Sequence, residues 1–141
     1  MPSIEELKSL ALSVLDNAYA PYSGVRVAAA LEAEDGSTYL GVNVENASLG
    51  LTICAERSAV ASMVTAGRRR VRKIVIVSST HDPLPPCGAC LQVLSEFGDP
   101  GTLVASFSAI SGKRAEWRLG ELAPHISSIK RIVGERRGAQ P

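Results

Sequence analysis

The chain has 141 residues, a length typical of one folded domain. Its 45% hydrophobic and 21% charged residues are close to ordinary globular usage, which argues against a disordered chain and against a coiled coil. The net charge of +1 argues against a strongly basic protein that binds nucleic acid. We interpret the local run "RRRVRK" (residues 68–73) as a solvated surface, and expect one domain over residues 1–128 followed by a basic tail over residues 129–141.

Targeting signals and cysteine usage indicate the compartment. No stretch reaches the roughly 18 apolar residues that a membrane helix needs, and the N-terminus lacks the basic-then-apolar order of a secretory signal. We therefore expect a cytoplasmic protein with no membrane contact. Three cysteines in a reducing compartment are a poor disulfide framework, so metal binding or catalysis is the better use for them.

The N-terminal part predicts one helix and two strands. Ser3 and Glu6 form a capping box, and apolar residues then recur at helical spacing, which predicts a helix over about residues 4–19. The motif "APYSG" ends it. The segment "VRVAAALEAEDGSTYLGV" then predicts two strands joined by a two-residue hairpin turn at Asp35 and Gly36.

The central part predicts two more helices around a buried strand. Thr52 is expected to cap the second helix and Gly67 to end it, so that Cys54 falls in the first turn. "KIVIVSST" is typical of a strand buried on both faces. A third helix is expected to begin just after Pro86 and to end at Gly98.

The last part, "TLVASFSA" and "RAEWRL", predicts a final pair of strands, with a short helix or irregular tail beyond. The order of these elements indicates the α/β class, with a mixed sheet and helices packed on its faces. In such layered folds, ligand sites gather where helix N-termini and loops converge. The starts of the second and third helices are therefore the places to search for chemistry.

The three cysteines lie at those two helix starts. Cys87 and Cys90 are spaced C-x-x-C, and with Cys54 they can converge as three ligands of a tetrahedral zinc. We find no convincing fourth ligand, because His81 and His125 lie in loop-like surroundings and are interpreted as surface residues. An open fourth position is typical of a catalytic zinc, which lowers the pKa of water towards ~7.

Glu56 follows Cys54 by two residues and is near enough to carry a proton for such a water. Taken singly, Glu56 is explained as an acidic residue that the helix dipole stabilises in a first turn, and Cys54 as a buried apolar residue that fills space in the core. Together with "PCGAC", however, the pattern C-A-E…P-C-x-x-C matches the zinc-deaminase signature in its three-cysteine form.

Three longer motifs between about residues 18 and 98 extend this likeness: "AYAPYSG", "GVNVENASLGLTICAER" and "PCGACLQVLSEFG". Here the sequence resembles the cytidine deaminase family, specifically its small, three-cysteine, homotetrameric branch. The resemblance implies a three-layer α-β-α fold with a mixed five-stranded sheet and one Zn²⁺ per subunit. It also implies Cys54, Cys87 and Cys90 as zinc ligands and Glu56 as the proton carrier.

The resemblance also implies residues that bind substrate. Asn43 and Glu45 would hold the ribose hydroxyls, and backbone groups near Ala55 and Cys87 would hold the pyrimidine edge. Alternation places Asn43 and Glu45 on one side of an extended segment, although such residues are more often bonded to their own backbone or solvated. Arg57 could donate to the sulfurs and offset part of their excess negative charge.

The implied reaction is hydrolytic deamination of cytidine and deoxycytidine to uridine, deoxyuridine and ammonia, as in pyrimidine salvage. Several family features are missing, and they concern the substrate more than the metal. Val25 stands where the family usually carries a phenylalanine that stacks on the base, Leu49 replaces a tyrosine and Leu91 an arginine. "LAPHIS" (residues 122–127) corresponds poorly to the family's C-terminal region, which lends an aromatic ring to a neighbouring subunit's site; His125 or Ile126 could substitute.

Three alternatives stay open, of which the first follows from these departures. One is a deaminase of a modified cytosine nucleoside such as blasticidin S, since stacking rings are scarce at 4% aromatic residues. Another is a nucleic-acid cytosine deaminase that uses "RRRVRK" to contact phosphates, although the chain lacks a broad basic surface. The third is a catalytically silent zinc module used for assembly.

Overall fold

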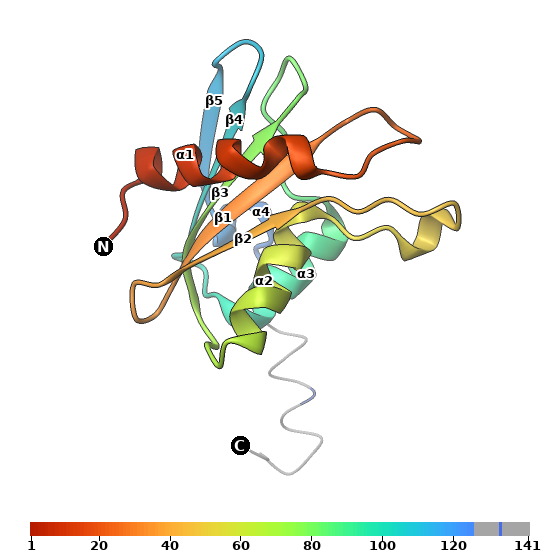
Figure 1. Ribbon diagram of the computed structural model, residues 1–141. Helices are drawn as coiled ribbons and strands as arrows, with labels where there is room; N and C mark the ends of the chain where they lie inside the picture. The colour runs from red at the N-terminus through yellow and green to blue at the C-terminus, as the bar shows by residue number, and fades with distance from the viewer. Residues whose placement is uncertain (126–132, 134–141) are drawn as a thin grey trace.

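A five-stranded sheet in the order β2-β1-β3-β4-β5 forms the middle layer of the computed structural model (Figure 1). Only β3 and β4 run parallel; the other neighbours are antiparallel. The strands are β1 (Val27–Ala33), β2 (Thr38–Val42), β3 (Val71–Ser78), β4 (Leu103–Ser108) and β5 (Arg114–Arg118). The structure describes residues 1–125 and residue 133, so Ile126 and almost all of the predicted tail over residues 129–141 lie outside the described residues.

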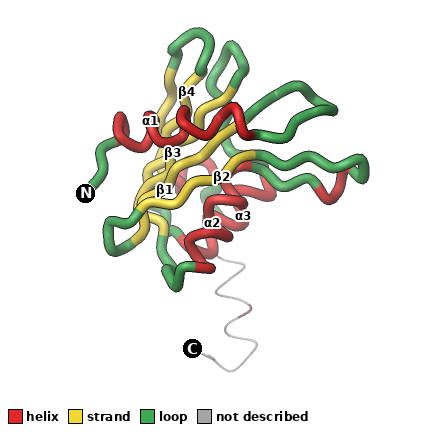
Figure 2. The backbone as a smooth tube through the Cα atoms, viewed as in Figure 1, coloured by secondary structure: helices red, strands yellow, loops and turns green. Residues whose placement is uncertain are grey.

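Helices cover both faces of this sheet (Figure 2). The helix α1 (Ile4–Val14) lies on one face, and α2 (Ala55–Thr65) and α3 (Gly88–Phe97) lie on the other. The short α4 (Leu119–Leu122) and the 3₁₀ turns η1 (Leu15–Asn17) and η2 (Leu49–Leu51) complete the elements. None of the described helices has the length and apolarity that crossing a bilayer requires. The predicted three-layer α-β-α fold with a mixed five-stranded sheet is confirmed.

The continuous apolar run of β3 explains why both faces are covered. Ile74 and Ile76 belong to the hydrophobic core under α2 and α3, whereas Val75 and Val77 belong to the core under α1. All four side chains are buried. Because successive side chains of a strand point to opposite faces, this one strand supplies both cores.

The ends of α1 and α2 can be compared with the capping residues predicted from the sequence. The Ser3 hydroxyl accepts a hydrogen bond from the Glu6 N–H at 3.1 Å, as expected of a cap. The α-helix ends at Val14 and continues only as the 3₁₀ turn η1, short of the predicted residue 19. Gly67 ends α2 with a φ of 87°, and its N–H donates to the Val64 carbonyl, as in a Schellman motif.

The hairpin between β1 and β2 is one residue longer than predicted. The Ala33 N–H donates to the Ser37 carbonyl at 2.8 Å, which leaves a loop of three residues, 34–36. Gly36 has a φ of 85°, and its N–H donates back to the Ala33 carbonyl. This is the geometry of a type I turn followed by a glycine bulge, so the predicted two-residue turn is wrong.

The strand β5 forms one edge of the sheet. Its charged residues Arg114, Glu116 and Arg118 are exposed, and Ala115 and Trp117 between them are partly buried. Alternation therefore turns a row of charges towards solvent along this edge.

Candidate active site

The first turns of α2 and α3 hold the three cysteines. Cys54 is the N-cap of α2, Cys87 is the N-cap of α3, and Cys90 lies one turn into α3. The sequence predicted Thr52 as the cap of α2 and Cys54 inside its first turn, and this prediction is wrong. Ile53 exchanges two hydrogen bonds of 2.9 Å with Val44, which keeps the chain extended as far as Cys54.

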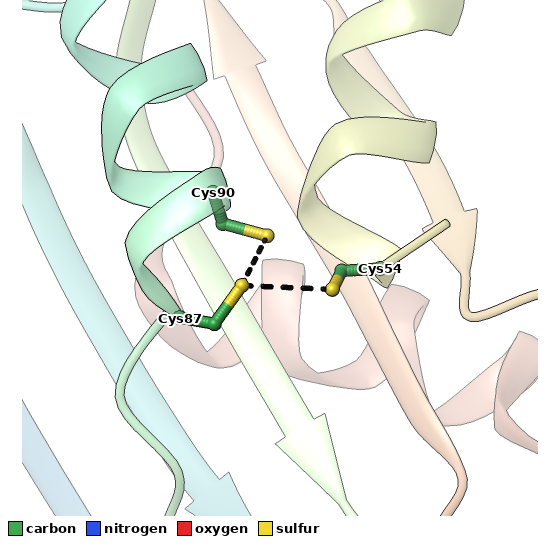
Figure 3. A group of neighbouring side chains, drawn as sticks. All are labelled: Cys54, Cys87 and Cys90. Carbon is green, nitrogen blue, oxygen red and sulfur yellow. Dashed lines mark hydrogen bonds between the residues drawn. The ribbon is translucent and has the colours of Figure 1, made fainter. Parts of the chain in front are cut away.

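The three sulfur atoms point towards one another (Figure 3). The Cys87 Sγ lies 3.7 Å from the Cys54 Sγ and 3.6 Å from the Cys90 Sγ. Three thiolates at ~2.3 Å from a tetrahedral zinc are about 3.8 Å apart, so these separations fit zinc. Within residues 1–125 and 133, these cysteines are the only group of three or more side chains able to share a metal ion.

Arg57 brings a positive charge to this cluster. Its Nη2 donates to the Thr52 carbonyl at 3.1 Å and to the Cys54 Sγ at 3.6 Å. A hydrogen bond from the Cys90 thiol, and after it the bond from Arg57, lower the pKa of Cys54 to about 5. The bond to Cys54 also raises the pKa of Arg57, while for Cys90 the bond to Cys54 and burial raise the pKa. The environment thus favours a thiolate at Cys54 and a guanidinium beside it.

Glu56 is the second residue of α2 and is only 5% exposed. Burial is the main cause that raises the pKa of its carboxyl to about 7, and the neighbouring Cys54 thiolate adds to it. A carboxyl group with a pKa near neutrality can both accept and release a proton there, as a general acid–base catalyst must.

A cavity of about 250 Å³ connects the helix starts with the predicted substrate residues. Its volume is close to the lower end of the roughly 300–1,000 Å³ typical of small-molecule sites. The predicted residues along its walls are Val25, Asn43, Glu45, Cys54, Ala55, Glu56 and Cys87. Cys90 and Arg57 do not line the cavity. Both reach the site through the other cysteines, since the Cys90 Sγ contacts the Cys87 Sγ and Arg57 donates to the Cys54 Sγ.

Asn43 holds the chain beside the cavity. Its Oδ1 accepts from the Val27 N–H and its Nδ2 donates to the Val25 carbonyl, both at 2.9 Å. A side-chain amide has two N–H donors and two carbonyl lone pairs. One donor and one acceptor of Asn43 therefore stay available for a ligand.

Glu45 holds the neighbouring loop. Its Oε1 accepts from the N–H groups of Tyr22 at 2.9 Å and Ser23 at 3.1 Å, and its Oε2 accepts from the Ser23 hydroxyl at 2.5 Å. The bond from that hydroxyl is the main cause that lowers the pKa of Glu45. The carboxylate is thus ionised at neutral pH and keeps acceptor capacity on Oε2.

Gly41 is a positioning residue that the sequence analysis missed. A Cβ atom built on Gly41 would lie 2.3 Å from the Ala59 nitrogen and 2.5 Å from the Ala55 oxygen. The backbone of α2 therefore packs directly on β2, which only glycine permits. This contact fixes the distance between the sheet and α2, the helix that carries Glu56. A glycine inside a strand pattern is the signal that could have revealed it.

Other lining residues also escaped the sequence analysis. Leu84 and Pro85 come from the loop before Cys87, while Val27 and Ile76 come from the sheet. The proline-rich stretch "HDPLPP" (residues 81–86) indicates a loop, but composition alone does not show that the loop lines a cavity.

Several residues singled out in the sequence lie elsewhere. Leu49 is 73% exposed and does not line the cavity, and Leu91 packs against the hydrophobic core. His81 and His125 are exposed, outside the sulfur cluster. Ile126 lies outside the described residues.

Three convergent sulfurs, a buried carboxyl group with a raised pKa and an adjoining cavity define a zinc-dependent deaminase of the three-cysteine type. Residues 1–106 match the family described as "Cytidine and deoxycytidylate deaminase zinc-binding region". The chain belongs to this family, and it is a hydrolase with one Zn²⁺ per subunit.

Similar proteins and a solved structure support membership of this family. The chain is 45% identical over 114 residues to a cytidine deaminase of Halalkalibacterium halodurans, covering 81% of this chain and 86% of that one. It is 36% identical over 139 residues to a cytidine deaminase of Mycobacterium tuberculosis, covering 97% and 100%. A crystal structure of cytidine deaminase from Burkholderia pseudomallei matches with a TM-score of 0.82 at 42% identity, covering 87% of this chain and 98% of that one.

Proposed function

We propose that the enzyme deaminates free cytidine and deoxycytidine to uridine and deoxyuridine, with release of ammonia, in pyrimidine salvage. The observation that carries this proposal is one cavity of about 250 Å³ lined by Cys54, Cys87 and Glu56 together with Asn43 and Glu45. Metal chemistry, proton transfer and sugar recognition can all occur within it. The cytidine deaminases to which the chain is similar support the same substrate.

The Sγ atoms of Cys54, Cys87 and Cys90 would hold the zinc ion. Their separations and their place at two helix N-termini suit thiolate ligands, because helix N-termini stabilise negative charge. When bound, zinc supplies a Lewis acid that lowers the pKa of water towards ~7. Arg57 would offset part of the charge of the thiolates through its bond to Cys54.

Glu56 moves the protons of the reaction. Its carboxylate takes a proton from water as the water oxygen adds to C4 of cytosine, and passes that proton to ring N3. The same side chain then takes the second proton and delivers it to the departing amine. Water and cytidine thus give uridine and ammonia, and the carboxylate is regenerated.

The remaining lining residues orient the nucleoside. Asn43 and Glu45 would bind sugar hydroxyls through the groups that their bonds to the chain leave available. Backbone groups of Ala55 and Cys87 would hold the pyrimidine edge, and Val25 would contact the base.

A deaminase of a modified cytosine nucleoside, such as blasticidin S, is the second candidate. The observation that favours it is the aliphatic character of the apolar wall. Val25, Val27, Ile76, Leu84 and Pro85 line the cavity, and no aromatic ring of the described residues joins them. Without a ring to stack on cytosine, the wall selects less strictly for a flat, unsubstituted base.

A nucleic-acid substrate is less well supported, because ion pairs occupy much of the basic run. Arg68 pairs with Asp35 at 3.0 Å and Arg70 with Asp99 at 3.2 Å. Lys73 pairs at 3.3 Å with Glu32. These arginine and lysine side chains are partly neutralised, which weakens the run as a phosphate contact.

We also propose a single domain over residues 1–128 with a basic tail, located in the cytoplasm, that assembles as a homotetramer. Large apolar side chains are exposed on two segments near the cavity: Tyr19, Tyr22, Val44, Leu49, Leu51 and Ile53. Exposed apolar side chains gathered on neighbouring segments are typical of protein interfaces. Analytical ultracentrifugation tests this assembly, and a monomer at micromolar concentration would contradict it.

Metal analysis combined with a nucleoside panel tests the function. Purified protein should contain one zinc per chain and release ammonia from cytidine and deoxycytidine. Rapid turnover of blasticidin S without turnover of cytidine would favour the second candidate. Bound zinc with no activity on any nucleoside would indicate a silent zinc module instead. Binding to oligonucleotides that weakens with salt would favour the nucleic-acid alternative.

A further inference from the structure

The Ser23 hydroxyl is a bridge at the edge of the cavity that the mechanism above does not use. It donates to the Glu45 Oε2 at 2.5 Å and accepts from the Val25 N–H at 3.0 Å. Ser23 and Val25 both line the cavity. One hydroxyl therefore joins the carboxylate of Glu45 to the backbone of a residue beside the base.

The bonds of Glu45 show what this bridge controls. The two backbone N–H groups of residues 22 and 23 use the acceptor capacity of Oε1, so the capacity left for a ligand is on Oε2. Ser23 bonds that same Oε2 and thus fixes the direction in which its free lone pair points. Short bonds between hydroxyls and carboxylates are the stronger kind of hydrogen bond and hold orientation well.

We propose that Ser23 is a positioning residue that aims the Glu45 carboxylate at a sugar hydroxyl. The proposal rests on the proposed nucleoside substrate. A sugar hydroxyl that donates to Oε2 shares this oxygen with Ser23. The Val25 N–H donates to the Ser23 hydroxyl and so fixes the direction in which that hydroxyl donates to Glu45.

Comparing two nucleosides tests this role. For Ser23→Ala we expect the KM of cytidine to rise about tenfold, the scale of one misdirected charge-assisted hydrogen bond, with kcat changed by less than about twofold. 2′,3′-Dideoxycytidine lacks both ring hydroxyls, so its kcat/KM should stay within about twofold of the wild-type value. The wild-type preference for cytidine over the dideoxy analogue should therefore shrink about tenfold.

Two variants control for folding. Ser23→Thr keeps the hydroxyl and should restore the KM of cytidine. Ser37→Ala removes a hydroxyl that donates to the Asp35 Oδ1 at the same 2.5 Å in the hairpin, outside the cavity lining, and should leave the KM of both nucleosides unchanged. Equal losses for both nucleosides in Ser23→Ala, or no loss for cytidine, would overturn the proposal.

Calorimetric binding of uridine and 2′,3′-dideoxyuridine separates this proposal from the substrate assignment. A wild-type enzyme that fails to deaminate cytidine but binds uridine more tightly than its dideoxy analogue would refute the assignment alone. Loss of that difference in Ser23→Ala would then support the positioning role, and its persistence would refute it. A wild-type enzyme that binds both uridines equally, or neither, would overturn both proposals.

Discussion

The site has two regions that are built differently. The metal region lies at the starts of two helices and consists of Cys54, Glu56, Cys87 and Cys90. The loop region consists of extended chain and a loop, and comprises residues 22–25 with Asn43 and Glu45. The helices of the metal region pack on the sheet and bury Glu56 and Cys90. The loop region depends on a few polar bonds near solvent, from Asn43, Glu45 and Ser23. A rigid support suits the reacting groups, and adaptable loops suit the choice of substrate. Substitutions in the loop region can thus alter the choice of substrate without altering the reaction.

The largest expected effect is the loss of a ligand in the metal region. Cys90→Ser should lower bound zinc to well below one per chain and reduce turnover more than 100-fold, since changes one shell further out already cost about 10–100-fold. Zinc analysis and uridine formation measure the two effects. Ser95→Ala on the same helix, whose hydroxyl bonds the Leu91 carbonyl, is the matched control. Full zinc content in Cys90→Ser would show that the sulfur cluster is not the metal site.

Glu56→Gln separates proton transfer from metal binding within the metal region. We expect zinc to stay bound and kcat to fall by about 10²–10⁴-fold, because a neutral amide cannot carry the proton. Stopped assays of uridine with parallel metal analysis check this. Near-normal uridine formation would remove Glu56 from its proposed role.

Gly41→Ala tests whether close packing holds the metal region rigid. The added methyl group must displace backbone atoms of α2, and overpacking of this kind costs about 1–3 kcal/mol. We expect a lower Tm, and a lower kcat because the helix bearing Glu56 shifts. Gly50→Ala is the control, since its Cβ would meet no atom within 4 Å. Equal Tm values for the two variants would show that the contact is unimportant.

Val25→Phe probes the loop region. An aromatic ring beside cytosine adds about 0.5–1.5 kcal/mol of stacking, so the KM of cytidine should fall about two- to tenfold with little change in kcat. Ile110→Phe, at an exposed turn, is the control. If Val25→Phe abolished turnover of cytidine while Ile110→Phe did not, the aliphatic wall would be needed for a bulkier substrate.

The smallest effect concerns the pH dependence of the loop region. Glu45 has a pKa below its usual value of 4.5, so its charged form stabilises the folded chain above that pH. The stabilisation is lost as pH falls through the lowered pKa. Wild type should therefore have a higher Tm than Glu45→Gln at neutral pH, and the difference should close as the solution is acidified below pH 4.5. A difference that is constant with pH would contradict the role of the charge.

Sequence predicted the metal region better than the loop region, for a physical reason. Cys87 and Cys90 lie three residues apart, a spacing that brings two side chains together at the start of a helix. Cys54 and Glu56 lie at the start of another helix, so each pair belongs to a single short segment. The loop region instead depends on bonds between distant residues, such as Asn43 with Val27 and Glu45 with Ser23. Spacing in the sequence gives no signal for such bonds.

The fold shows the same contrast. Ser3, Gly67 and the apolar run of β3 act locally, and their effects were predicted. The order of the strands and the approach of α2 to Gly41 are set by packing across the sheet, which local patterns do not report. The shift of the α2 cap from Thr52 to Cys54 has the same origin, because pairing of Ile53 with Val44 overrides the capping preference of threonine.

The charges along β5 have a consequence for contacts between copies of the chain. An open strand edge offers unpaired N–H and C=O groups to any other strand, and this is a route to endless sheets and aggregation. Arg114, Glu116 and Arg118 place charge along that edge, so another strand would have to desolvate them to pair there. The edge at β5 thus resists fibril-like growth.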